Sequence, residues 1–305
     1  MPGLLVDPFA APFMARALTE LALLALMCGP VSVFIFVRRL SFVADALTHT
    51  VFPGVVIGYL AGGVEGIFGG ALVAGLVTAI ALSLLTRHGR LTEDAAIAVM
   101  LTAMFSVGVI LVSRRSSYTA DLTSFLFGRV LTVSREQLVQ TGVLAVVVLV
   151  LLAVSARVLI FRAFDPVGAA AAGYRIGWLD TWLNVIVALV VVAAVRAVGT
   201  VLVVALLLVP AATARLLTDR LLAMAVVGVG VTLGAGYLGL LASWTASVDH
   251  GLRLTSASAV VLALVAAYLL ALPVGVLRAR RARRRATTLP GTSGAVPGPT
   301  GLVHR

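Results

Sequence analysis

The sequence predicts an all-α integral membrane protein, a polytopic bundle of about nine transmembrane helices. Of the 305 residues, 61% are hydrophobic and only 11% are charged, whereas a soluble domain has about a quarter charged residues. Apolar runs of about 20 residues, the length that crosses a hydrocarbon core about 30 Å thick, recur along nearly the whole chain. The bilayer is therefore the expected solvent for most of the chain, with eight to ten crossings as the range.

Three regions follow along the chain. Residues 1–14 hold several prolines and lack the basic start and cleavage site of a signal peptide, so we expect this N-terminal segment to be retained. Residues 15–277 form the transmembrane domain, and the arginine-rich tail 278–305 is predicted to be disordered beside an anionic leaflet. The expected spans are 15–37, 46–60, 67–85, 95–112, 137–160, 181–195, 198–217, 222–241 and 256–277.

The cationic residues predict how the chain is oriented in the membrane and exclude two kinds of active site. All 23 are Arg, and without Lys the chain can form neither a Walker phosphate-binding loop nor a Schiff base. Any ATP must be handled by a partner. Placing the N-terminus outside puts 16 of the 23 arginines on the cytoplasmic side, together with the C-terminus, as the positive-inside rule requires. The net charge of +11 is then explained by the membrane, and no nucleic-acid partner is expected.

The stretch 45–54 places an acid and an imidazole among apolar residues. In a helix, Asp45 and His49 project from one face about one turn apart, close enough to share a cation. An unpaired charge at the bilayer centre costs roughly 3 kcal/mol, so Asp45 needs a cation, a proton or a partner. The alternative is an interfacial helix cap with His49 bonded to a carbonyl. Pro53 and Gly54 are expected to start, bend or closely pack a helix, and Pro210 is expected to kink one.

The loop 161–179 is predicted to contain a helix of about two turns. It has an N-cap residue, a proline at the first helical position and a glycine at the end. Such a helix either lies at the lipid headgroups or docks a cytoplasmic partner. In the docking interpretation, the coupling residues are Phe164, Asp165, Pro166, Ala169 and Gly173.

Four segments, in this order, resemble the permease subunit of bacterial ABC importers for zinc and manganese, the ABC-3 family. They are 45–54, 121–128 ending in Phe-Leu-Phe-Gly, the loop beginning at Phe164, and 199–214 with its Leu-Val-Pro-Ala-Ala-Thr-Ala end. The resemblance covers about residues 15–275. The stretch 255–258 departs from the family pattern, because it lacks the proline and glycine often found there.

The resemblance implies a homodimeric permease in the bacterial plasma membrane. Its substrate would be a divalent metal delivered by an extracytoplasmic metal-binding protein, and a separate ATPase would bind the loop 161–179. Asp45 and His49 match the acid and the histidine of the family's translocation path. Across a twofold axis, two such pairs would balance a divalent ion and supply four ligands.

The nature of the substrate and of the energy source leaves alternatives open. Two carboxylates and two imidazoles suit tetrahedral zinc, while added water or oxygen ligands would suit manganese or iron. No permanently bound cofactor is expected. The rival functions are a proton-coupled secondary metal transporter, which needs no ATPase, and a membrane scaffold that transports nothing.

Overall fold

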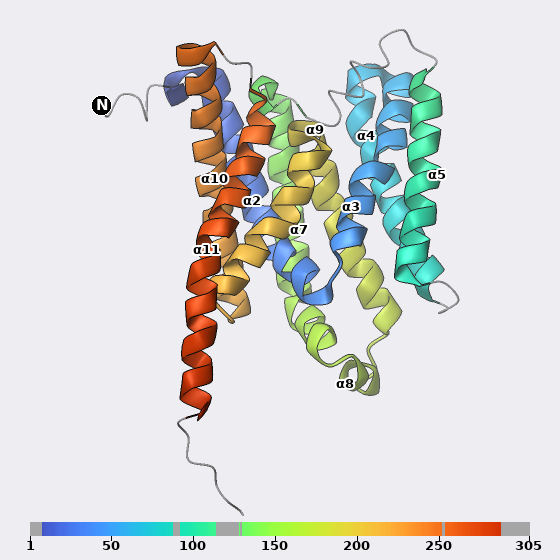
Figure 1. The fold of residues 1–305 in the computed structure, drawn as a ribbon. Coiled ribbons are helices and arrows are strands. Elements are labelled where there is room, and N and C mark those ends of the chain that lie inside the picture. The colour runs from blue at the N-terminus through green and yellow to red at the C-terminus, as the bar shows by residue number, and fades with distance from the viewer. Residues whose placement is uncertain (1–7, 88–91, 114–127, 129, 252–253, 288–305) are drawn as a thin grey trace, which may run out of the picture.

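The computed structural model describes residues 8–87, 92–113, 128, 130–251 and 254–287, and the secondary structure in these ranges is entirely helical (Figure 1). This confirms the predicted fold class. The helices are α2 (Pro12–Arg38), α3 (Ser41–Thr50), α4 (Phe52–Arg87), α5 (Glu93–Ser113), the 3-10 helix η1 (Val130–Thr132), α7 (Arg135–Phe164), α8 (Pro166–Ala171), α9 (Ile176–Leu217), α10 (Leu221–His250) and α11 (Ser256–Thr287).

Seven helical stretches of the described chain are long and apolar enough to cross a membrane, with α3 and α4 forming one of them. Two of the seven contain non-helical glycines, in α4 and in α9. Each of these stretches is too long for a single crossing and doubles back at its glycines. With each arm counted separately, the described helices make nine passes through the bundle, the number expected for the crossings. The described N-terminal end and the end of α11 lie at opposite ends of the bundle (Figure 1).

The hairpin in α4 turns at Gly62 and Gly63, where Gly63 has a φ of 62° that favours glycine. Beyond the turn, the two arms touch through their backbones. A Cβ on Gly54 would collide with the carbonyl of Gly70, and a Cβ on Gly58 with that of Gly66. Small residues let transmembrane backbones approach closely, so Gly54 has a packing role within the hairpin.

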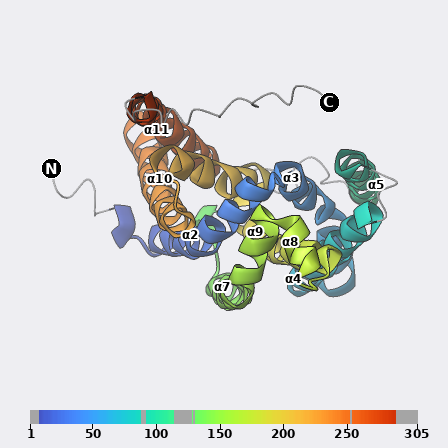
Figure 2. The ribbon, with the colours of Figure 1, turned by 90° about the horizontal axis from the view of Figure 1, so that it is seen from below.

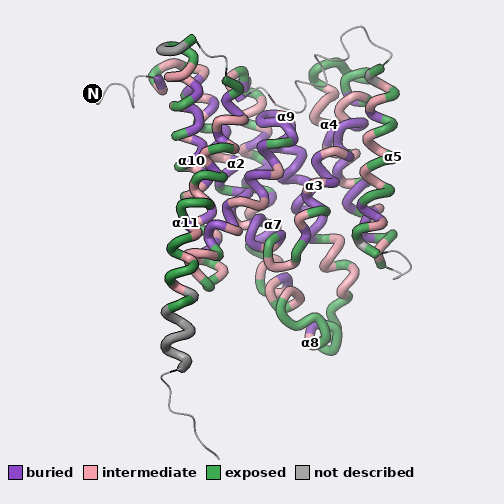
Figure 3. The backbone as a smooth tube through the Cα atoms, in the orientation of Figure 1, coloured by how far each residue is buried: buried purple, intermediate pink, exposed green. Residues whose placement is uncertain are grey.

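Helix α9 is the centre of the bundle, and most of its residues are buried. Its first turns meet the end of α2, where Arg38 pairs with Asp180. Its last turns return to the same end, where Ala214 packs with Val33 of α2. The reversal lies at Gly199, which has a φ of 75°. Figure 3 shows the buried segments running through α2, α3 and α9.

The peripheral helices surround this centre. Seen from below, α7 lies on the outside of the bundle, and α10 and α11 lie at the opposite end from α5 (Figure 2). Many large apolar side chains of α7 are exposed, including Val146, Val150 and Val154. These are the surfaces that a bilayer would cover.

One detail differs from the sequence prediction. The tail is not disordered from its first residue, because α11 continues as a helix to Thr287, where its own backbone hydrogen bonds carry it beyond the apolar span; residues 288–305 lie outside the described ranges. The break in α9 comes at Gly199, within two residues of the expected boundary between the spans 181–195 and 198–217, and the kink at Pro210 stays a prediction. Pro53 is the second residue of α4 and follows directly on the α3–α4 junction.

Candidate metal site

Helix α3 begins at a sharp turn at the end of α2. Arg39 adopts a left-handed conformation with a φ of 58°. Its N–H donates to the carbonyl of Phe36, and the N–H of Leu40 donates to that of Ile35. These bonds satisfy the last carbonyls of α2 in the manner of a Schellman motif. The chain is thereby redirected into α3 within three residues.

One stripe of α3 is open, while the rest of the helix is buried. Phe42, Asp45 and His49 follow one another at helical spacing and are exposed or half-buried. The buried residues face the core and include Val43, Ala44, Ala46, Leu47, Thr48 and Thr50. The predicted common face of Asp45 and His49 is therefore present, and it points away from the core of this chain.

The two side chains are close without being hydrogen-bonded to each other. His49 Nε2 lies 3.7 Å from Asp45 Oδ1, and 27% of the His49 side chain and 42% of the Asp45 side chain are exposed. Two ligand atoms on one tetrahedral ion stand about 3.3 Å apart when each bond is about 2.0 Å. A small side-chain rotation would suffice to seat one cation on both. The ring of Phe105 from α5 meets the His49 ring edge-on, with centroids 5.9 Å apart.

The neighbouring hydroxyls of α3 donate hydrogen bonds to backbone carbonyls of the same helix. Thr48 Oγ1 donates to the carbonyl of Asp45 at 2.6 Å, and Thr50 Oγ1 donates to that of Leu47. Among the described residues, no group of three or more His, Cys, Asp or Glu side chains could hold a metal. One chain thus offers two ligands at this position.

The predicted loop helix is present as α8. Asp165 Oδ1 accepts the N–H of Gly168 at 2.7 Å, and Pro166 occupies the first turn. The end is a Schellman motif in which the N–H of Tyr174 donates to the carbonyl of Ala169 and Gly173 has a φ of 88°. The role of these residues in coupling to an ATPase stays a prediction.

The side chains in and beside α8 differ in burial. Ala169 is fully buried, whereas Phe164 and Val167 are 66% and 78% exposed. Phe164 and Val167 therefore offer apolar surface to a partner.

Sequence reasoning missed a buried polar cluster between α2, α7 and α9. Glu20 has no exposed surface and accepts a hydrogen bond from Thr141 Oγ1 at 2.8 Å. Arg196 Nη1 donates to Gln140 Oε1 at 2.6 Å and lines the same small pocket as Glu20. The sequence did contain one indication of this cluster, because Glu20 is a glutamate inside the apolar run 15–37.

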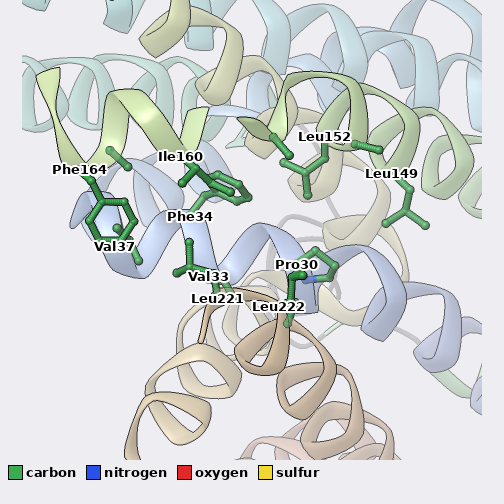
Figure 4. A pocket seen from close by; sticks show the side chains of 14 residues that line it. Pro30, Val33, Phe34, Val37, Leu149, Leu152, Ile160, Phe164, Leu221 and Leu222 are labelled. Atoms are coloured by element: carbon green, nitrogen blue, oxygen red, sulfur yellow. The ribbon is translucent and has the colours of Figure 1, made fainter. Parts of the chain in front are cut away.

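An apolar cleft of about 250 Å³ lies between α2, α7 and α10 (Figure 4). Phe34, Ile160 and Leu152 are among the side chains that line it in Figure 4. Its lining side chains are all apolar and offer no ligand atom for a cation. The cleft is therefore excluded as the metal site, and the open stripe of α3 remains the candidate.

A match to a known family decides the class of this bundle. The model of the ABC 3 transport family matches residues 10–275. This chain belongs to the ABC 3 transport family. The family membership confirms the predicted function, a multi-pass membrane permease of a bacterial ABC importer, and places the chain in the plasma membrane.

Curated relatives and a solved structure support the family match. The manganese transport system membrane protein MntC of Halalkalibacterium halodurans is 40% identical over 209 residues, covering 68% of this chain and 71% of that protein. MntC of Listeria monocytogenes is 35% identical, with coverages of 78% and 84%. The structure described as PsaBC from Streptococcus pneumoniae in complex with Fab aligns with a TM-score of 0.76 at 29% identity, covering 89% of this chain and 95% of the other.

The comparisons leave the individual site residues open. Gly128, the last residue of the predicted 121–128 match, lies against Val198 and Gly199 at the apex of α9, while residues 121–127 fall outside the described ranges. The structure thus brings together two of the four matching segments. Asp45 and His49 lie on α3, which packs against α9.

Proposed function

We propose that this permease imports a divalent transition metal, with manganese favoured over zinc and iron, and that Asp45 and His49 bind the ion as it crosses. The observation that carries the proposal is the open stripe of α3, where an acid and an imidazole stand 3.7 Å apart within a membrane-spanning bundle. Relatives named for manganese transport support the choice of metal. Carboxylate and water oxygens beside imidazole suit that ion.

The proposed active form is a homodimer. Asp45 has 42% of its side chain exposed on a helix of the membrane-spanning bundle, and contact of this carboxylate with lipid would be costly. A second copy meeting the first across a twofold axis would cover this stripe and contribute its own acid and imidazole. Two carboxylates would then offset the two positive charges of the ion.

The energy source is proposed to be a separate ABC ATPase that docks on α8. The exposed Phe164 and Val167 give that partner an apolar contact. An extracytoplasmic metal-binding protein would deliver the ion at the opposite end of the bundle. Membership of an ABC transporter family supports both partners.

Reconstitution with the cognate ATPase in liposomes tests the function. We expect uptake of radioactive manganese that requires ATP on the side of the membrane where α8 lies and the ATPase docks. Unlabelled manganese should compete most strongly with this uptake. Uptake driven by a proton gradient without the ATPase would instead establish a secondary transporter. No metal binding at all would establish a scaffold.

The orientation has its own test, with a matched pair of cysteine variants in a Cys28→Ser background. Ala170 on α8 and Ala61 beside the α4 turn are both exposed, at opposite ends of the bundle. We expect an impermeant thiol reagent outside intact cells to label Ala61→Cys and to spare Ala170→Cys. The reverse pattern would place α8 outside and rule out ATPase docking there.

A further inference from the structure

Three helix ends are joined by one carboxylate beside α8. Asp180, the fifth residue of α9, accepts a hydrogen bond on Oδ1 from Arg38 Nη2 at 2.8 Å and on Oδ2 from Arg162 Nη2 at 3.1 Å. Arg38 is the last residue of α2, and Arg162 lies in the last turn of α7. We call Asp180, Arg38 and Arg162 the inner clamp.

The two arginines of the clamp are largely buried, and both depend on its single acid. The side chains of Arg38 and Arg162 are 13% and 16% exposed, and that of Asp180 is 32% exposed. Charge-assisted bonds of this kind are strong and directional. Neutralising Asp180 would leave two largely buried guanidiniums facing each other without a counter-charge.

The place of the clamp along the chain links the two functional segments. Helix α8 is held between the end of α7 and the start of α9, and both of these carry a clamp residue. The third residue, Arg38, stands three residues before α3 and seven before Asp45. Between them lies the tight turn at Arg39, which leaves little slack to absorb a displacement of Arg38.

We propose that Asp180 is a positioning residue for transport, which passes displacements of α8 through Arg38 into α3 and so alters the placement of Asp45. The proposal rests on the proposed function, in which α8 docks the ATPase and α3 binds the ion. Coupling between two sites is reciprocal. The same contact therefore carries the effect of bound metal back to the ATPase.

The chain contains a matched control for this role. Asp219 also lies between two arginines, with Arg215 Nη1 at 3.0 Å and Arg278 Nη2 at 3.2 Å. Its ion pairs join the end of α9 to α11, and among the described residues neither partner belongs to α8 or α3. Its side chain is 71% exposed. Neutralising Asp219 removes the same chemistry at a place where no coupling is expected.

The test uses the whole complex with its ATPase in lipid, and it measures ATP hydrolysis with and without Mn²⁺. We expect Asp180→Asn to reduce the stimulation by Mn²⁺ at least about fivefold, the low end of typical coupling between sites. The basal rate and the equilibrium binding of Mn²⁺ should stay within about twofold of wild type, because both binding segments remain intact. Asp219→Asn should keep the wild-type stimulation.

Each other outcome has a distinct meaning. Wild-type stimulation in Asp180→Asn would overturn the inference, as would an equal loss in Asp219→Asn. A wild-type complex without any stimulation would count against the proposed function instead. If Asp180→Asn does not assemble, Arg38→Lys serves in its place, since it keeps the charge and loses the planar fork. A smaller loss is then expected, and full stimulation would again overturn the inference.

Discussion

Two carboxylates lie within the membrane-spanning helices of this protein in contrasting surroundings. Glu20 on α2 has no exposed surface, and Thr141 donates a hydrogen bond to it at 2.8 Å. Asp45 on α3 is 42% exposed and stands 3.7 Å from its nearest ionisable neighbour, His49. The residue types are alike, but only Asp45 is available to a passing ion.

The surroundings explain the difference. The pocket beside Glu20 has a volume of about 10 Å³, room for about one water molecule. Arg196 lines that pocket and interacts electrostatically with Glu20, so a cation would be repelled there. Asp45 shares its open stripe with an imidazole. In this protein the accessible acid, Asp45, is therefore the candidate for the ion path, and the buried acid, Glu20, is not.

The largest expected effect comes from Asp45→Asn. The variant keeps the size of the side chain and removes the charge that offsets a dehydrated dication. We expect manganese uptake to fall between about tenfold and 100-fold, the upper value corresponding to roughly 3 kcal/mol for an uncompensated charge. Radiometal uptake at equal membrane abundance is the measurement. A wild-type rate would move the ion path away from α3.

A smaller loss is expected for His49→Gln, because the charge of Asp45 remains and one neutral donor atom is lost. Uptake should fall on the order of tenfold. Metal binds only the neutral imidazole, so wild-type uptake should also decline as the outside becomes more acidic. The variant should show a flatter response over the same range. An unchanged pH profile in His49→Gln would remove this residue from the ion path.

A still smaller effect on transport is expected for Glu20→Gln, which keeps an acceptor for Thr141 and lies away from the ion. Uptake should stay within about twofold of wild type. A fall as large as that of Asp45→Asn would erase the distinction between the two carboxylates.

Thr141→Val tests the structural side of the comparison. The substitution removes the hydrogen bond donated to the buried carboxylate of Glu20 and should lower the free energy of unfolding by about 1–3 kcal/mol. The thermal midpoint in detergent should then fall by about 2–6 °C. Uptake per folded molecule should be unchanged. An unaltered midpoint would mean that this bond contributes nothing to the stability of the bundle.

Features that depend on local interactions could be predicted from the sequence. The apolar runs predicted nine crossings because a helix in lipid satisfies its own backbone and needs only length and composition. The caps of α8 follow from Asp165, Pro166 and Gly173, whose preferences act within one turn. The common face of Asp45 and His49 follows from the helical repeat alone.

What depends on distant partners was decided only by the tertiary structure. The inner clamp joins Arg38 to Asp180, 142 residues apart, and Glu20 meets Thr141 across 121 residues. The sequence predicted two spans within 181–217, but only the structure shows that Gly128 packs against the backbone of α9 at its reversal, Gly199. Side-chain pairing and close backbone approach depend on which helices become neighbours, and no local propensity specifies that.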